Sequence, residues 1–280
     1  MAAVAYGLGM AQIAVVGGDA VGNLERAAGA IAAAGTQGLR VVVLPECLDL
    51  GWTHPSARLR AEPIPGPRSE RLARAAREAG IWVCAGLTER AGERVHNAAV
   101  LLDPRGRIVL HHRKIHELAI AADLYATGDR LAVADTPLGR VGLAICADNL
   151  PGATVLGHAL ARMGAQVVLS PCAWAVPANH DQAADPYGAA WLRSYGELAR
   201  LYDLTLVGVS NVGPLTAGPW RGRRCIGCSL AVGPGAEVLA RGPYGVTAEA
   251  LIPVTVTPVA PIAWGDGFVP ALRARGYEAL

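Results

Sequence analysis

Short apolar runs rich in β-branched residues alternate with helix-like segments along the whole chain, and this alternation restricts the possible folds more than any other feature. The strand-like runs include QIAVVGGD (residues 12–19), LRVVVLPE (39–46), IWVCAGL (81–87), VGLAIC (141–146), QVVLSP (166–171) and LTLVGVSN (204–211). Helices are expected at residues 23–34, from an N-cap at Ser69 to Gly80, at 153–165 and at 187–202. Interleaved strands and helices are typical of α/β proteins, in which helices cover a sheet.

Two tight turns join neighbouring apolar runs directly. Pro104-Arg105-Gly106 separates NAAVLLD from IVLHHRK, and Pro137-Leu138-Gly139 separates LAVAD from VGLAIC. Turns of this kind make antiparallel hairpins, so the sheets should be mixed rather than purely parallel. No repeat, long linker or low-complexity tract divides the order, and we therefore expect one α/β domain over residues 1–280.

The composition allows a large core and excludes several classes of function. Hydrophobic residues make up 52% and charged residues 17%, and the net charge is only +2. Without a basic cluster we expect no nucleic-acid partner and no binding to an anionic membrane. No stretch approaches the roughly 20 apolar residues of a membrane span. The apolar start Ala2–Val16 lacks a basic beginning and contains Gly7 and Gly9, so it is expected to lead into the first strand rather than to be a secretory signal.

The cysteines and histidines do not form a metal-binding pattern. Six scattered cysteines favour reduced thiols and a cytoplasmic location over a disulfide framework. Cys225 and Cys228 have no second pair to complete a zinc site. The neighbouring histidines lie in a segment that looks extended, so we expect no metal there: His111, His112 and His116. The glycine cluster after the QIAVV run has Asp19 where a dinucleotide fold needs its second glycine.

Three reactive side chains follow three strand-like runs. Glu46 ends VVVLPE, Lys114 ends IVLHHRK, and Cys146 ends VGLAIC. Taken singly, Glu46 could cap a turn, Lys114 could lie in solvent and Cys146 could fill the core. Ligands collect at strand ends in layered α/β proteins, however, and a base, a cation and a thiol are what attack on an amide carbonyl requires. Their common placement favours a catalytic site.

These segments, in this order, resemble the nitrilase superfamily of carbon–nitrogen hydrolases. The resemblance rests on VVVLPE, HHRKIH, VGLAICAD and CSLAVGPGAEVLA and extends over nearly the whole chain. It implies a four-layer α-β-β-α sandwich that uses no metal or organic cofactor. Cys146 would be the nucleophile, Glu46 the general base, and Lys114 with the backbone N–H of Ala147 would stabilise the oxyanion. Family members usually pair through their helices, and the mean hydropathy of +0.31 also favours a homodimer or a larger even-numbered oligomer.

The chain departs from the family pattern at a second glutamate. Many members carry this glutamate seven residues before the glycine of a Pro-Gly-Asp segment. Here that segment is Thr127-Gly128-Asp129, and the position holds Ala121. We expect Glu117 to substitute for the missing acid as a further catalytic residue, with Asp123 as the alternative.

The substrate is predicted less sharply than the reaction. Asp148, after the nucleophile and Ala147, favours amide-type substrates, although Asn149 replaces the arginine that often follows. The segment from Ser170 to Pro186 should form part of the pocket. Its candidate substrate-binding residues, with one after the glutamate strand, are Trp174, His180, Asp181 and Trp52. With a single Phe in the chain, a large aromatic-lined acyl pocket is not expected, and a small polar or short aliphatic acyl group fits better.

The predicted function is therefore a cysteine-dependent hydrolase that releases ammonia from a small amide or an N-carbamoyl compound. A nitrilase, or an amide or acyl transferase using the same thioester, is an alternative within the same fold. A non-catalytic binding member of the family is the alternative from another class.

Overall fold

The protein is built around two six-stranded mixed sheets, seen in a computed structural model that describes residues 4–260 and 267–278. The first sheet has the order β15 (Ala250–Val256), β1 (Tyr6–Gln12), β2 (Val41–Val43), β3 (Trp82–Ala91), β4 (Arg94–Leu102) and β5 (Ile108–Arg113). The second has the order β14 (Glu237–Arg241), β13 (Leu230–Gly233), β10 (Thr205–Ser210), β8 (Val167–Cys172), β7 (Gly139–Leu143) and β6 (Val133–Thr136). A small sheet adds β11 (Val212–Pro214), β12 (Arg224–Ile226) and β9 (Ala175–Val176).

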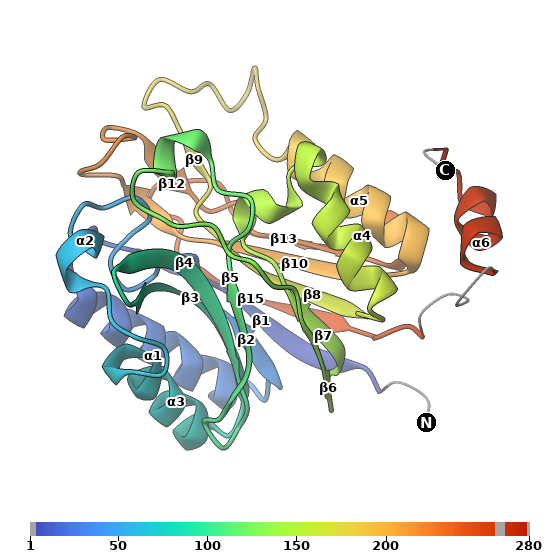
Figure 1. Ribbon diagram of the computed structural model, residues 1–280, viewed down its shortest axis with the longest axis horizontal. Helices are drawn as coiled ribbons and strands as arrows, with labels where there is room; N and C mark the ends of the chain where they lie inside the picture. Colours follow the sequence, from blue (N-terminus) through green and yellow to red (C-terminus); the bar gives the residue numbers. More distant parts are fainter. Residues whose placement is uncertain (1–3, 261–266, 279–280) are drawn as a thin grey trace.

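Helices cover the outer face of each large sheet. Helices α1 (Ala20–Thr36) and α3 (Pro67–Ala79) lie on the first sheet, and α4 (Thr154–Arg162) and α5 (Ala189–Tyr202) lie on the second (Figure 1). Two short helices, α2 (Ala57–Arg60) and α6 (Phe268–Ala274), lie outside this framework. The predicted four-layer α-β-β-α sandwich is confirmed.

The two-residue period of the strands explains how one apolar run serves two layers. In β2, Val42 packs with Leu24 and Leu72 of the helices, in one hydrophobic cluster. Its neighbours Val41 and Val43 belong to the cluster between the sheets. Because successive strand residues point to opposite faces, a strand covered on both sides reads as a continuous apolar run.

The position of the first strand and the start of helix α5 differ from the sequence-based expectation. The first strand is Tyr6–Gln12, so the prediction of a strand over residues 12–19 was wrong. Gly7 and Gly9 lie inside the strand because side chains of Leu39 and Leu251 occupy the space where a Cβ would stand. Helix α5 begins at Ala189 rather than at residue 187.

Helix α3 begins two residues before the predicted cap. Its first residue is Pro67, and Ser69 lies inside the first turn, where its hydroxyl accepts from the N–H of Gly66 and donates to the carbonyl of Gly66. The predicted end is confirmed, because Gly80 has a left-handed φ of 66°.

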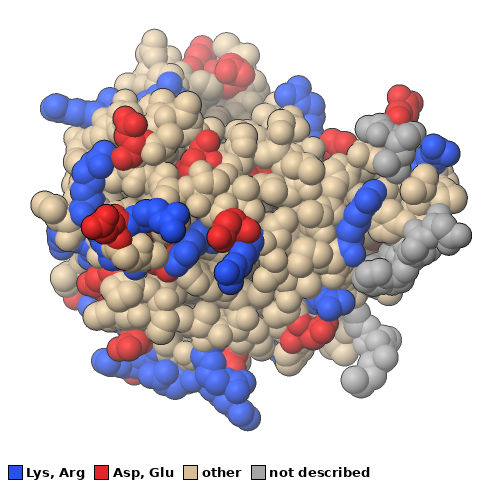
Figure 2. Space-filling model, in the orientation of Figure 1, with Lys and Arg blue, Asp and Glu red and all other residues tan. Residues whose placement is uncertain are grey.

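Within residues 4–260 and 267–278, no helix has the length and apolar character needed to cross a membrane, and no cluster of His, Cys, Asp and Glu could hold a metal ion. All six cysteines are free thiols. Basic and acidic side chains lie next to one another on the face that Figure 2 shows.

Candidate active site

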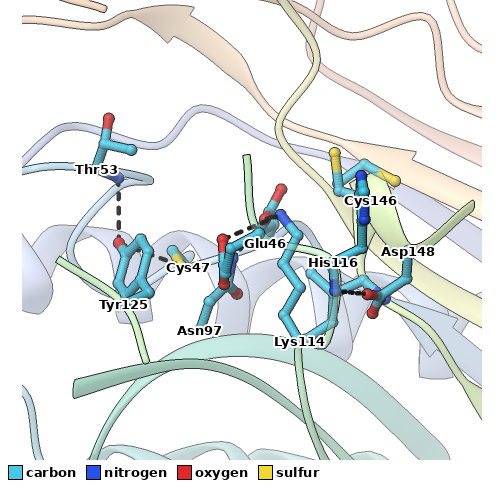
Figure 3. A network of polar contacts seen from close by, with 12 residues as sticks. Glu46, Cys47, Thr53, Asn97, Lys114, His116, Tyr125, Cys146 and Asp148 are labelled. Carbon is cyan, nitrogen blue, oxygen red and sulfur yellow. Dashed lines mark hydrogen bonds and ion pairs between the residues drawn. The ribbon is translucent and has the colours of Figure 1, made fainter. Parts of the chain in front are cut away.

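The ends of β2, β5 and β7 bring the three predicted reactive residues to one corner of the sandwich. Glu46 and Lys114 follow strands of the first sheet, and Cys146 follows a strand of the second. The Lys114 ammonium donates to Glu46 Oε1 at 2.6 Å, and both side chains are almost fully buried (Figure 3). Lys114 and Cys146 line the same cavity. The structure therefore brings the predicted triad together.

Cys146 occupies a strained position at the start of a turn. Its φ of 43° lies in the left-handed region, and it begins the 3₁₀ turn Cys146–Asn149. A non-glycine residue in this region costs of order 1 kcal/mol or more, so such positions cluster at functional sites. Ser170 supports the turn, because its hydroxyl accepts from the Cys146 N–H at 3.2 Å and from the Asn149 amide at 3.0 Å. With this backbone conformation the chain leaves the direction of β7, and Cys146 lines the cavity.

The thiol of Cys146 is held in its protonated form. A hydrogen bond with the Cys172 thiol, burial and the charge of Glu46 raise its pKa well above the ordinary value, although the Lys114 charge acts in the opposite direction. A protonated thiol is a poor nucleophile, so a base must remove its proton at the moment of attack.

Glu46 has one oxygen engaged and one oxygen free to act as that base. Its Oε1 accepts from Lys114 and, at 2.6 Å, from the Asn97 amide. Its Oε2 is buried without a hydrogen-bond partner among the described residues. The Glu46 N–H donates to the carbonyl of Cys172 at 3.2 Å, which connects the base directly to the second sheet.

Lys114 carries its charge in spite of its burial. Burial lowers its pKa, but the charge of Glu46, joined by those of Glu117 and Cys146 when these groups are ionised, outweighs burial, and the net pKa lies well above the ordinary value. Its ammonium also lies 5.8 Å from the centre of the Trp52 ring, within range of a cation–π interaction. A fixed buried cation of this kind can stabilise a developing oxyanion.

Glu117, which we expect to substitute for the missing glutamate, lies beside Lys114. Its Oε2 is 3.8 Å from the Lys114 ammonium, its side chain is 4% exposed, and neither oxygen has a hydrogen-bond partner among the described residues. Burial raises its pKa to about 8, against the lowering effect of Lys114, and Glu46 and Asp148 add to the rise. The alternative acid, Asp123, is exposed at the surface, and its carbonyl accepts from Arg58.

Asp148 faces the protein rather than the cavity. Its Oδ1 accepts from the N–H groups of Ile115 and His116, and its Oδ2 accepts from the N–H of Ile145 and from His112 Nε2, all within 3.1 Å. Burial alone would raise its pKa, but these hydrogen bonds and the charge of His112 lower it. The structure therefore does not bring Asp148 to a substrate. It connects the turn after Cys146 with the loop after Lys114 (Figure 3).

The cavity beside Cys146 has a volume of about 480 Å³. It is lined by Trp52, Lys114, Leu118, Cys146, Ala147, Leu150, Ala173, Trp174, Ala175, Asp185, Pro186, Tyr187, Gly188, Ala189, Ala190, Trp191, Arg193 and Trp220. Of the predicted substrate-binding residues, Trp52, Trp174 and Ala147 belong to this lining.

The other two candidates from the segment before Pro186 lie outside the cavity lining. The His180 ring contacts Gln182 and lies 4.0 Å from the Asp185 carboxylate. Asp181 accepts from backbone N–H groups of its own loop. Both side chains therefore stabilise the loop in which they lie, and the structure does not bring them to the reactive residues.

The expectation that the pocket would not be aromatic was wrong. Four of the six tryptophans and Tyr187 line the cavity. The low number of Phe residues did not predict the lining, because tryptophans from four separate segments meet at this cavity. Trp191 and Trp220 could not be found for the same reason. A signal existed for Trp191, because it lies on the predicted helix over residues 187–202, on the face that is buried.

Comparisons with known proteins identify the family of the chain. The family model for carbon–nitrogen hydrolases matches residues 7–257. The omega-amidase NIT2 of Bos taurus is 32% identical over 54% of this chain and 58% of its own length, so the match spans little more than half of that relative. A nitrilase of Pyrococcus abyssi is 32% identical over 78% of this chain and 77% of its own length.

Solved structures show the same fold. An amidase from Nesterenkonia sp. superimposes with a TM-score of 0.75 at 22% identity, and the match covers 91% of both chains. A cysteine-to-alanine mutant of the same amidase, in complex with butyramide, gives a TM-score of 0.76 at 21% identity over 98% of this chain and 95% of that one.

Proposed function

The chain belongs to the carbon–nitrogen hydrolase family, and from that premise we propose that it is a cysteine-dependent amidohydrolase that releases ammonia from a small-molecule amide. One observation carries the proposal. A buried Lys114–Glu46 pair and a strained, protonated Cys146 come from different strands and meet beside one cavity. The three groups match the three needs of amide cleavage, which are proton removal, oxyanion stabilisation and a nucleophile.

In the acylation step, Glu46 takes the thiol proton and the sulfur of Cys146 attacks the amide carbonyl carbon. The negative charge on the carbonyl oxygen is stabilised by Lys114 and by the Ala147 N–H, which lies in the first turn of a 3₁₀ segment where backbone donors have no partner within the segment. Glu46 returns the proton to the amide nitrogen, the C–N bond breaks, and ammonia leaves. The product on the enzyme is a thioester on Cys146.

In the deacylation step, the same glutamate takes a proton from water. The hydroxide attacks the thioester carbonyl at the same oxyanion site, the C–S bond breaks, and the thiolate is reprotonated. The sum is one amide and one water converted to one carboxylic acid and one ammonia. We assign Glu117 to the same site as an acid that contacts Lys114 and the substrate nitrogen, because its free oxygens lie beside the lysine.

Replacement of Cys146 tests the proposal. Cys146→Ala should lower ammonia release by several orders of magnitude while circular dichroism shows an unchanged fold. Cys172→Ala is the matched control. It should retain activity within about tenfold, and because the Cys172 thiol raises the pKa of Cys146, it should speed alkylation of Cys146 by iodoacetamide at a given pH. Activity of Cys146→Ala close to that of the unmodified protein would refute the assignment.

The competing reactions are separated by the products formed. Ammonia release from amides, measured against nitriles and against transfer of the acyl group to hydroxylamine, distinguishes hydrolase, nitrilase and transferase. A non-catalytic protein would form no thioester, and mass spectrometry of Cys146 after incubation with an amide would reveal that.

We also propose that residues 1–280 form a single domain that works as a homodimer or a larger even-numbered oligomer in the cytoplasm. Six free cysteines support a reducing compartment. Several large apolar side chains exposed on the helices, including Val155 and Met163 of the α4 region, support an association surface. A monomer in light scattering at micromolar concentration would contradict the oligomer.

A further inference from the structure

The cavity above Cys146 has walls that are far more aromatic than its chemistry requires. The reactive end is polar and is formed by Lys114, Cys146 and the backbone of Ala147. Away from this end, the large side chains of the lining are mostly aromatic: Trp52, Trp174, Tyr187, Trp191 and Trp220. Four of the six tryptophans of the chain line this one cavity, and their concentration there needs an explanation.

The aromatic rings form two groups, held by different parts of the fold. Trp174, after β8, and Trp191, on α5, are stacked with ring centres 4.9 Å apart and an interplanar angle of 23°. Trp52, after the Glu46 loop, and Trp220 meet edge to face at 5.0 Å. The first group lies under α5, and the second lies on the side of Lys114. Both groups belong to the lining of the cavity.

The backbone is adapted to hold the first group. A Cβ on Gly208 of β10 would lie 3.0 Å from the Trp174 ring and 2.4 Å from the Tyr195 hydroxyl. Trp174 therefore extends over bare backbone into a buried position, with 1% of its surface exposed. The indole N–H groups of Trp174 and Trp52 are both buried without an acceptor among the described residues. Ring packing, and not a hydrogen bond of the indole, therefore holds these two side chains in place.

The lining offers no buried charge for a second ionic group on the substrate. Besides Lys114, which is paired with Glu46, its charged side chains are Asp185 and Arg193, and both are exposed. No buried charge in the lining is therefore available to fix a carboxylate or an ammonium group at the far end of the acyl chain.

We propose that the acyl part of the substrate is neutral and aromatic, joined to the amide carbonyl by a short chain, as in an arylalkanamide. This inference rests on the proposed amidohydrolase function and specifies its substrate class. Aromatic rings pack well against offset or edge-on aromatic rings, and burial of the added ring surface favours a phenyl-bearing acyl group over an alkyl group of the same chain length.

A substrate series tests the inference. Hydrocinnamamide, in which an ethylene chain joins a phenyl ring to the amide carbonyl, should be hydrolysed with a kcat/KM at least about tenfold above those of butyramide and succinamic acid. If butyramide is hydrolysed as well as or better than hydrocinnamamide, this inference fails and the amidohydrolase proposal stands. If succinamic acid is the best of the three, the acyl site is anionic-selective, and the inference fails as well.

Binding to the Cys146→Ala protein separates the pocket from the chemistry. Calorimetry should show hydrocinnamamide binding at least about tenfold more tightly than butyramide. Equal affinities would overturn the aromatic acyl site. Preferential binding of the phenyl compound to this variant, together with an unmodified protein that turns over no amide, would refute the amidohydrolase proposal and support the pocket.

A matched pair of aromatic variants locates the preference. Trp220 is partly exposed, so Trp220→Leu should fold, and it should reduce the preference for hydrocinnamamide over butyramide in kcat/KM by about tenfold. Tyr244 is an exposed aromatic residue outside the lining, and Tyr244→Ala should leave the preference unchanged. An unchanged preference in Trp220→Leu would show that Trp220 does not contact the acyl group, and it would overturn the proposal that both groups of aromatic rings form the acyl site.

Discussion

Glu117 is the residue that we propose in place of the family glutamate missing at Ala121. It lies three positions after Lys114, and its Oε2 is 3.8 Å from the lysine ammonium. Because its pKa is raised to about 8, it is mostly protonated at neutral pH and can both donate and accept a hydrogen bond. Burial is the main cause of this rise, and the negative charge of Glu46 adds to it against the lowering effect of Lys114.

Replacing Glu117 by Gln should lower kcat at least about a hundredfold, because the amide keeps the size of the side chain but cannot ionise. Asp123→Asn is the control. Asp123 is exposed and distant from the cavity lining, so its variant should have normal turnover. Steady-state ammonia release measures both. A near-normal rate in Glu117→Gln would leave Glu117 without a catalytic role.

The same carboxyl group should make stability depend on pH. Its pKa is about 8 in the folded protein against an ordinary value of 4.5, so between these values the folded state holds a proton that the unfolded state has lost. Stability must then fall as pH rises through this window, with a slope of about 1.4 kcal/mol per pH unit from this one group. Urea unfolding at three pH values inside the window should show this slope in the unmodified protein and its loss in Glu117→Gln. Equal slopes in both proteins would place the pKa of Glu117 outside this window.

At the residue scale, the sequence predicted the reactive groups and not their surroundings. Glu46, Lys114 and Cys146 could be found because strand ends are visible in an apolar pattern, and parallel strands place their ends together. Most partners of Asp148 could not be found, since three of its four donors lie in β5 and in the loop after it, and the approach of this segment to Asp148 depends on the docking of two sheets. The composition also gave a wrong prediction of the pocket lining, because a residue count does not show which tryptophans meet at the cavity.

At the scale of elements, strand β3 supports the loop that carries Glu46 by direct backbone contact. A Cβ on Gly86 would lie 2.6 Å from the Glu46 Cα and 2.7 Å from the carbonyl oxygen of Pro45. The Gly86 N–H donates to that same carbonyl, and the Leu48 N–H donates to the carbonyl of Gly86. The loop can lie this close to the strand only because residue 86 has no side chain.

Gly86→Ala should therefore displace Glu46 and lower turnover at least about tenfold, since small misplacements of catalytic groups are costly. It should also cost about 1–3 kcal/mol of stability through overpacking. The control is Gly29→Ala on the exposed face of α1, where a Cβ meets nothing within 4 Å. That variant should gain about 0.5–1 kcal/mol with unchanged turnover. Urea unfolding and kcat measure the pair, and normal turnover in Gly86→Ala would show that the loop adjusts without loss.

Asp148 joins two elements, the turn that carries Cys146 and the loop that follows Lys114. In Asp148→Asn, an amide N–H₂ group would face backbone N–H groups, and we expect a loss of about 2–4 kcal/mol of stability. Turnover of the folded fraction should also fall, because the nucleophile and the lysine lose their fixed separation. Asp103→Asn is the matched control, since Asp103 is another buried carboxylate held by backbone N–H groups, in a turn outside the cavity lining. It should lose stability and keep its kcat. If both variants keep a normal kcat, Asp148 serves stability alone.

Element boundaries were predicted well where local chemistry decides them and poorly where packing does. Gly80 ends α3 because its own backbone adopts the left-handed conformation. The first strand was placed too late because two glycines lower strand propensity. In the folded protein, the side chains of Leu39 and Leu251 fill the space above them. Neither leucine is near these glycines in sequence, so the local sequence does not show the packing that makes up for the missing side chains.

At the scale of the whole molecule, one apolar cluster contains residues of both large sheets and of α4 and α5. Met10 and Val43 of the first sheet share it with Leu143 and Leu169 of the second and Leu198 of α5. A shared core of this kind should unfold as one unit, which is the expectation for a single domain. Tryptophan fluorescence and far-ultraviolet circular dichroism should therefore give coincident urea transitions. Two separated transitions would divide the chain into independent parts.

The alternation of strands and helices was enough to predict an α/β protein, but the four-layer arrangement was expected from resemblance to a family. Alternation does not say which strands are neighbours. The pairing of β1 with β15 joins opposite ends of the described chain, and no local pattern could predict it.

That pairing has a consequence for how the protein is made. Strand β1 lies between β2 and β15, and Tyr6 lies opposite Val256. The ribosome adds about 5–20 residues per second, so roughly 10–50 s pass between the synthesis of the first strand and that of its second neighbour. For all of that time one edge of β1 has no partner on its own chain, and an open strand edge is a template for pairing with other chains. A cell that makes this protein must keep each nascent chain away from its neighbours until almost the last strand has been translated.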